Sequence, residues 1–318
     1  NVHGVGQISK HMAELKIHSF ESCREFLLGL GSKETVNEQI LDDGDKLVLK
    51  ITISEGGATF DFSGTSEVRK DNLNATEAIV LSSIAYCLRV LIGRNLPLNE
   101  GLLDSIRVVL PSDCLLSPKF EKNPELCPGV AGGNVEISQR LVDLIMTSFG
   151  VMACSQGTMN NLTFGNENFS HYETIGGGSG ATLGMNGCSA VQVHMTNTSI
   201  TDPEILEARF PLSLLGFRIR KKSGGDGAWI GGDGIERRYL FEENLWLSIL
   251  SQRRKRGPEG LDGGFRGLVG KQFIIRNGKV INLDRTDTFE AKSGDCLVMK
   301  TPGGGGFGKP VVPVFPKT

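Results

Sequence analysis

The sequence lacks the usual signatures of several protein classes. Its seven cysteines include no Cys-x-x-Cys pair, and its five histidines include neither an HExxH motif nor a His-x-His pair. A zinc knuckle and a disulfide framework are therefore not expected, and neither is a metal site built wholly from this chain. An odd number of widely spaced cysteines favours a reducing compartment, so we expect a cytoplasmic protein.

Long apolar runs and an excess of charge of one sign are also absent. The longest apolar stretch, residues 78–92, is interrupted by Ser82, Ser83 and Arg89, whereas a membrane span needs roughly 18 uninterrupted apolar residues. The 34 basic and 36 acidic residues give a net charge of −2, which argues against wholesale binding of nucleic acid. We therefore expect neither a membrane nor a nucleic acid as a partner.

Glycine, in contrast, is abundant. The chain has 42 glycines in 318 residues, nearly twice the usual frequency of about 7%. The glycines fall in scattered clusters, which predicts many tight turns or close approaches between backbone segments.

The spacing of apolar residues predicts a mixed α/β fold, with helices and a mixed sheet in the first two-thirds and mostly antiparallel strands in the last third. Helices are predicted at 7–30, 76–93, 135–149 and from 201 onward. Strands are predicted at 46–54, 58–62, 105–110, 237–241, 245–251, 272–276 and 296–300, with a hairpin turn at 277–278. We divide the chain into a mixed core, 1–215, and a β-rich region, 216–318, that packs on the same core.

The first helix begins close to the first residue, which is Asn1 rather than methionine. We therefore expect the chain to be a piece of a longer or processed polypeptide.

Two glycine motifs resemble nucleotide-binding loops. Residues 303–309 read GGGGFGK, but Pro310 follows where a serine or threonine should open a helix. The GxGxxA pattern that begins at Gly176 also lacks a following helix. We predict a mobile or tightly turned loop at 303–309 and close backbone packing at Gly176, rather than nucleotide sites.

A third glycine motif precedes the helix predicted at 135–149. Gly132, Gly133 and Asn134 have the composition of an anion site at a helix N-terminus. An ordinary helix cap by Asn134 explains the same residues, so both interpretations stay open.

The basic region 209–256 includes the run RRKR but no RNA-binding signature. We interpret it as a solvated or partner-facing surface.

Three segments combine polar side chains with glycine, and we predict that they converge on one cleft. Their candidate substrate-binding residues are Asn160, Asn161, Tyr172, Thr196 and Asn197, and their candidate catalytic residues are Glu173 and His194. Such groups either fix a small polar substrate or bridge loops, because buried polar groups need partners. The apolar residues around His194 predict a strand in which His194 faces away from Val193. There it is either a proton-transfer group or a core histidine bonded to the backbone.

Read together, nine ordered strings resemble one family. They are DFSGTS (61–66), NLNA (72–75), GGNVEISQR (132–140), QGTMNN (156–161), YETIGGGSGA (172–181), HMTNTSITDPEILEARFP (194–211), GGDG (231–234), GLDGG (260–264) and TPGGGGFG (301–308). This set resembles the C-terminal part of the hydantoinase B/oxoprolinase family, and most of all its ATP-dependent oxoprolinase branch. The resemblance extends from about residue 7 to residue 310.

The resemblance implies one part of a two-part enzyme. A hydantoinase A-like ATPase part, on the same polypeptide or a separate subunit, binds ATP and Mg²⁺ and phosphorylates a small cyclic amide. The hydantoinase B part then completes hydrolysis, which for the oxoprolinase branch opens 5-oxo-L-proline to L-glutamate. The family's divalent metal ligands lie upstream, so this chain alone is expected to hold no cofactor and to be inactive. We also expect a homo-oligomer.

The sequence departs from the family's pattern at a few positions. Gln192 and Ser199 stand where relatives usually have a histidine and an arginine, and Gln252 stands where they usually have a glutamate. Two alternatives therefore stay open beside the oxoprolinase interpretation. One is a hydrolase of hydantoins or other lactams, or a ketone carboxylase subunit, and the other is a degenerate, non-catalytic scaffold.

Overall fold

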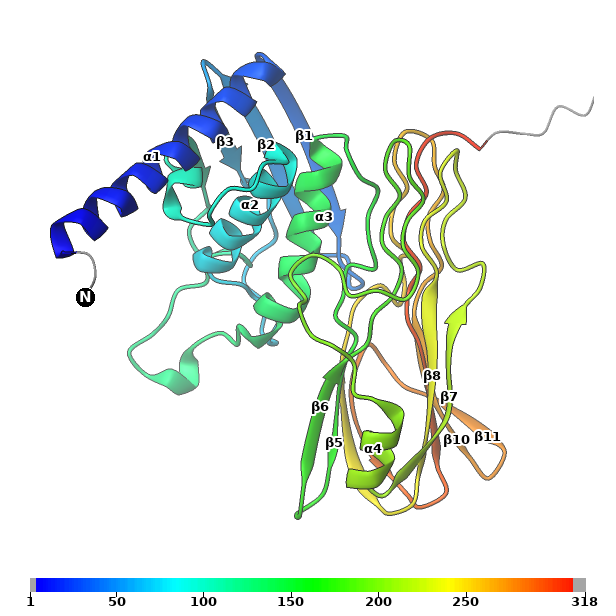
Figure 1. The fold of residues 1–318 in the computed structure, drawn as a ribbon. Helices are drawn as coiled ribbons and strands as arrows, with labels where there is room; N and C mark the ends of the chain where they lie inside the picture. The colour runs from blue at the N-terminus through cyan, green and yellow to red at the C-terminus, as the bar shows by residue number, and fades with distance from the viewer. Residues whose placement is uncertain (1–3, 311–318) are drawn as a thin grey trace, which may run out of the picture. The chain divides into compact units, whose positions relative to one another are not determined.

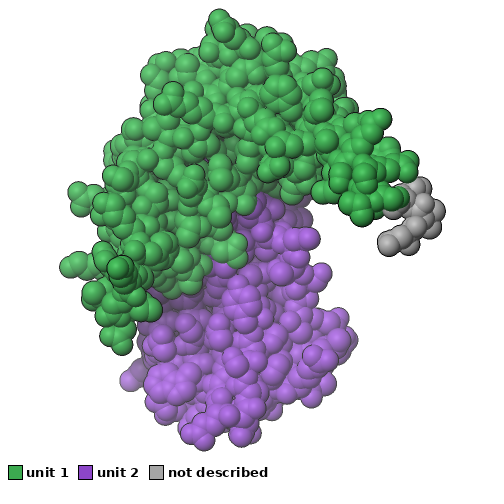
Figure 2. All heavy atoms as spheres, turned by 90° about the vertical axis from the view of Figure 1, so that its left-hand side faces the viewer, with its two compact units in different colours: residues 1–40, 45–134 green, residues 41–44, 135–318 purple. Residues whose placement is uncertain are grey.

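The computed structural model describes residues 4–310 and confirms the mixed α/β fold (Figure 1). The chain forms two compact units, residues 1–40 with 45–134 and residues 41–44 with 135–318, which Figure 2 distinguishes by colour. The boundary that we placed between residues 215 and 216 falls inside strand β7 (Leu212–Arg220) of the second unit.

The first unit contains a four-stranded sheet with helices. The strands run in the order β1-β2-β3-β4, antiparallel except that β4 is parallel to β3. Alternate residues of β2 from Leu47 to Ile53 are buried, the pattern of a sheet with one covered face. The elements are α1 (Val5–Leu30), β1 (Lys33–Ile40), β2 (Lys46–Ser54), β3 (Gly57–Asp61), α2 (Glu77–Ile92), η1 (Glu100–Leu103), β4 (Ile106–Val109) and η2 (Pro124–Leu126).

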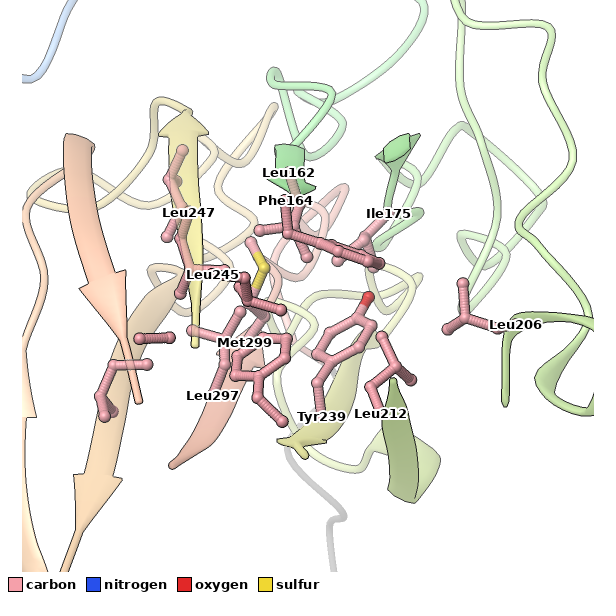
Figure 3. Packing of buried hydrophobic residues seen from close by; sticks show 14 of the residues in the cluster. Leu162, Phe164, Ile175, Leu206, Leu212, Tyr239, Leu245, Leu247, Leu297 and Met299 are labelled. Atoms are coloured by element: carbon pink, nitrogen blue, oxygen red, sulfur yellow. The ribbon is translucent and has the colours of Figure 1, made fainter. Parts of the chain in front are cut away.

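The second unit contains two antiparallel sheets that share one hydrophobic core. One sheet has the order β11-β10-β13-β8-β7 and the other β12-β9-β5-β6. Phe164, Leu247, Tyr239 and Met299 come from both sheets and meet in this core (Figure 3). The π-helix η3 (Gly133–Ile137) begins in the last two residues of the first unit and continues into the second. The remaining elements of the second unit are α3 (Ser138–Ser148), β5 (Asn161–Gly165), β6 (Ser170–Thr174), α4 (Pro203–Arg209), β8 (Gly234–Phe241), β9 (Leu245–Leu250), β10 (Lys271–Arg276), β11 (Lys279–Asn282), β12 (Thr286–Ala291) and β13 (Cys296–Lys300).

Most of the predicted helices and strands are confirmed within a few residues. The Asn277–Gly278 turn joins β10 to β11, and both residues have positive φ, as a tight hairpin of this kind requires. Strands β1, β5, β7, β11 and β12 were not predicted. The exposed or mixed faces of β1, β7, β11 and β12 carry no clear alternation of apolar residues, and β5 is only five residues long. None of the helices within residues 4–310 is both long and apolar enough to cross a membrane.

The abundant glycine builds a bundle of extended segments packed backbone against backbone. We call residues 176–181, 224–234, 257–267 and 303–308 the glycine bundle. Gly304 N–H donates to the carbonyl of Gly232, and the carbonyl of Gly304 accepts from Gly225 N–H, both at 2.8 Å. A Cβ atom on Gly304 would lie 1.9 Å from the carbonyl oxygen of Ser179. Only glycine permits such an approach.

The glycine bundle overturns the prediction of a mobile or tightly turned loop at 303–309. Residues 303–307 are buried, and of these glycines only Gly308 has a positive φ. The run is an interior segment whose N–H groups donate to neighbouring segments. One example is Gly305 N–H, which donates to the carbonyl of Cys154. The close packing predicted at Gly176 is confirmed, since a Cβ there would lie 2.9 Å from the backbone of Val191.

Candidate active site

Polar side chains of the second unit gather around α3, a helix that is buried on every side. Arg140 and Asp143 lie one turn apart on this helix, and Glu136 lies on the π-helix before it. All three side chains are at most 1% exposed. Because buried charge must be compensated, these residues mark a region of specific polar contacts inside the unit.

Glu136 begins a hydrogen-bonded chain that leads to the outer face of the β12-β9-β5-β6 sheet. Its Oε1 accepts from the Asn161 side-chain amide at 2.8 Å and from Met159 N–H at 3.1 Å. The Asn161 carbonyl oxygen in turn accepts from the Tyr172 hydroxyl at 2.7 Å. Two predicted substrate-binding residues, Asn161 and Tyr172, are thus brought together.

Burial has the largest influence on the pKa of Glu136. It raises the pKa of this carboxyl group to about 8, although the Thr158 hydroxyl, the Met159 N–H group and the charge of Arg254 favour the ionised form. Arg254 itself donates to Gln272 and to the carbonyl of Gln252. Burial therefore favours the neutral form of Glu136, which is unusual for a glutamate and typical of functional carboxyl groups.

A second group, the ionic cluster, consists of Arg140, Asp143, Arg253 and Glu259. Arg253 donates to Glu259 Oε2 at 2.5 Å and to Asp143 Oδ2 at 3.2 Å. Burial and the nearby charge of Arg253 lower the pKa of Arg140 to about 10. A Cβ on Gly157 would lie 2.8 Å from both Arg253 Nε and Asp143 Oδ2, so this glycine makes room for the pair.

The ionic cluster predicts acid sensitivity. Burial alone would raise the pKa of Glu259, but Arg253 and Arg140 hold it at about 2. A depressed pKa stabilises the fold above the unfolded-state pKa and loses this contribution as pH falls toward the folded-state value. The free energy of unfolding of the wild type, relative to Glu259→Gln, should therefore fall by about 2 kcal/mol from about pH 6 to about pH 3. Urea titrations of both proteins measure this difference.

Glu290→Gln controls for the loss of a surface carboxylate, since Glu290 pairs with Lys292 in an exposed position. A wild-type advantage over Glu259→Gln that stayed constant with pH would contradict the ionic cluster as described.

His194 lies near the ionic cluster rather than on a strand. Its Nε2 is 3.6 Å from Asp143 Oδ1, and its side chain is 6% exposed. The predicted strand is wrong, because His194 has a φ of 52° in a turn in which Thr196 N–H donates to the Val193 carbonyl.

Glu173 points to the opposite side of β6 from Tyr172. Tyr172 is 52% exposed, whereas Glu173 is 4% exposed and accepts from the hydroxyl of the core residue Tyr239 at 2.5 Å. Its other oxygen lies 3.5 Å from Arg237 and 3.9 Å from His171. Neighbouring strand residues face opposite sides, so Tyr172 and Glu173 cannot line one cleft.

The other predicted residues are dispersed. Asn160 is buried and donates to Gln156 and to the carbonyl of Ile175. Thr196 accepts from the Gln139 amide at 2.8 Å, and Asn197 is exposed. The seven residues therefore occupy several separate places, and the expectation of a single cleft is not met.

The predicted anion-binding group belongs to the first unit and has internal roles. Gly132 N–H donates to the carbonyl of Asn72, and Gly133 N–H donates to that of Val130. Cβ atoms on these glycines would lie 2.7 and 2.6 Å from the carbonyls of Asn72 and Asn74. The glycines thus permit close packing, and the helix begins as a π-turn at Gly133 instead of at an Asn134 cap.

Sequence reasoning missed Glu136, Arg140, Asp143, Arg253 and Glu259. A signal existed for Arg140 and Asp143, because two opposite charges three residues apart interrupt an otherwise apolar helix pattern. Nothing in the sequence marks the burial of Glu136.

A cavity of about 650 Å³ lies on the outer face of the β12-β9-β5-β6 sheet. Thr163, Ser170, Trp246 and Ser248 are among its lining residues. Thr163, the cross-strand neighbour of Tyr172, lines this cavity, whereas Tyr172 itself is not a lining residue. Within residues 4–310, no three histidine, cysteine, aspartate or glutamate side chains are grouped to hold a metal ion.

Comparison with known proteins identifies the family of this chain. The chain is 43% identical to 5-oxoprolinase 1 of Arabidopsis thaliana over 96% of its length, and 40% identical to the 5-oxoprolinase of Dictyostelium discoideum over 97%. It spans about 25% of the length of each. The crystal structure of the ATP-dependent caprolactamase from Pseudomonas jessenii has the same fold, with a TM-score of 0.83 and 20% identity, over 96% of this chain and 57% of that one. The family profile described as Hydantoinase B/oxoprolinase matches residues 1–310, and the chain therefore belongs to this family.

Proposed function

We propose that this chain is the hydantoinase B-type part of an ATP-dependent 5-oxoprolinase, which opens 5-oxo-L-proline to L-glutamate. The observation that carries the proposal is the 40–43% identity to two 5-oxoprolinases over nearly the whole chain. Those relatives are about four times as long, which leaves room for a fused ATPase part.

The chemistry explains why ATP would be needed. Resonance gives an amide C–N bond partial double-bond character, so an unstrained lactam resists attack by water. Phosphorylation of the lactam oxygen removes this protection and makes the ring carbon electrophilic. We assign phosphorylation, ATP and Mg²⁺ to a hydantoinase A-like ATPase part. We assign the completion of hydrolysis to the hydantoinase B-type part, to which this chain belongs. We place the family's divalent metal on an upstream segment and derive no step through it.

The test uses the complete protein, with its ATPase part, supplied with ATP and Mg²⁺. We expect glutamate from 5-oxoproline, and no product from the present chain alone. Caprolactam, hydantoin, and acetone with bicarbonate test the other reactions of the family. Preference for one of these substrates would replace the proposed one, and a complete protein that converts none of them would favour the non-catalytic scaffold.

A further inference from the structure

The hydrogen bonds around Asn161 have a fixed direction. Its side-chain nitrogen lies 2.7 Å from the carbonyl oxygen of Leu250 and 2.8 Å from Glu136 Oε1. A backbone carbonyl only accepts, so the end of the amide that faces Leu250 must be the NH₂ group. The carbonyl end of Asn161 then faces Tyr172, whose hydroxyl must donate to it.

The inner end of the chain is also fixed as an acceptor. Glu136 Oε1 accepts from Met159 N–H as well as from Asn161, and a backbone N–H only donates. Any proton on Glu136 therefore resides on Oε2. All bonds of the chain run inward, from Tyr172 through Asn161 to Glu136.

The direction of these bonds determines the role of the Tyr172 hydroxyl. A phenol has one proton, and here the proton is committed to Asn161 at 2.7 Å. The hydroxyl oxygen of a half-exposed side chain is left to accept from outside. The cross-strand neighbour of Tyr172, Thr163, lines the cavity on this face of the sheet.

We propose that Tyr172, oriented by Asn161 and Glu136, is a specificity-determining hydrogen-bond acceptor for the ring N–H of a secondary lactam bound at this face of the sheet. The inference rests on the proposed function for the identity of the ligand. The direction of the hydrogen bonds depends only on Leu250, Asn161, Met159 and Glu136. Glu136 and Asn161 act as positioning residues. They hold Tyr172 in the role of acceptor.

The inward direction survives ionisation of Glu136. The groups that face this carboxyl group are the Thr158 hydroxyl, the Met159 N–H group, the Asn161 amide and the charge of Arg254. Loss of the proton near pH 8 leaves Oε1 an acceptor, so Asn161 and Tyr172 keep their orientation. Selection for the ring N–H should therefore be equal at about pH 7 and about pH 9, whereas a proton-transfer role for Glu136 would make it change.

The experiment compares 5-oxoproline with N-methyl-5-oxoproline in the complete protein, both as substrates and as ligands titrated without ATP. In Tyr172→Phe, the preference for the N–H compound should fall roughly 2- to 12-fold relative to wild type, the range for one neutral hydrogen bond. The loss should appear in KM more than in kcat. Tyr86→Phe, in α2 of the first unit, controls for removal of a phenol hydroxyl.

Asn161→Leu removes the positioning amide and should give the same loss, provided that its thermal unfolding matches the wild type. Glu136→Gln should retain the preference, because the Gln carbonyl oxygen can accept the same two bonds. A Tyr172→Phe protein that keeps the full wild-type preference overturns the inference, whether measured by turnover or by binding. A wild type that binds the N–H lactam selectively but never hydrolyses it would overturn the proposed function alone.

Discussion

Alanine in place of Gly304 is expected to cost the protein its folded state. The new methyl carbon would lie 1.9 Å from the Ser179 carbonyl oxygen and 2.8 Å from Gly180 N, both of which are backbone atoms that cannot rotate away. We expect a loss of at least about 4 kcal/mol, a size reached only by exceptional single substitutions and comparable with the whole stability of many domains. Thermal unfolding and the yield of soluble protein measure it.

Gly216→Ala is the matched control in the same unit. The nearest atoms to its new Cβ are side-chain carbons of Arg238, at 3.7 Å or more, which is ordinary contact. We expect a change of less than about 1 kcal/mol, in either direction. Similar stability of the two variants would show that the glycine bundle is not as closely packed as described.

Arg253→Met is expected to have the second largest effect on stability. The substitution keeps much of the side-chain volume but leaves Asp143 and Glu259 without the guanidinium group that pairs with both. Breaking a buried pair in this way costs about 3–5 kcal/mol, because a charge remains buried without compensation. Urea unfolding at neutral pH measures the loss.

Arg218→Met provides the comparison for a surface pair. Arg218 contacts Glu236 at 2.7 Å, yet its side chain is 64% exposed, so its removal should cost no more than about 1 kcal/mol. If Arg253→Met cost as little as Arg218→Met, the ionic cluster would contribute no net stability.

The sequence predicts those parts of the fold in which one face is buried and the other exposed. β2 alternates cleanly from Leu47 to Ile53, and the Asn277–Gly278 turn specifies its hairpin locally. The glycine bundle could not be predicted from the sequence, because the same glycines are compatible with turns, phosphate loops and close packing. Only the partner segments, such as Ser179 and Gly232 against Gly304, distinguish these roles.

The candidate site was harder to predict for a related reason. Asn161 and Tyr172 are in contact, as expected, but Glu136, to which Asn161 donates, lies 25 residues before Asn161 in sequence. Tyr172 and Glu173 are adjacent in sequence yet separated by the plane of the sheet. Grouping polar residues by segment ignores this alternation, which explains why the predicted single cleft divides into separate groups.

The division of labour between an ATPase part and this part is the central claim, and a single-turnover experiment tests it most directly. The complete protein is mixed with ATP and 5-oxoproline, and ADP and glutamate are measured in the first turnover. In Tyr172→Phe and Asn161→Leu, we expect ADP to form at the wild-type rate when 5-oxoproline is saturating, because the phosphorylation step belongs to the ATPase part. Slower ADP formation in these variants at saturating 5-oxoproline would contradict the claim, because these residues would then act in the phosphorylation step.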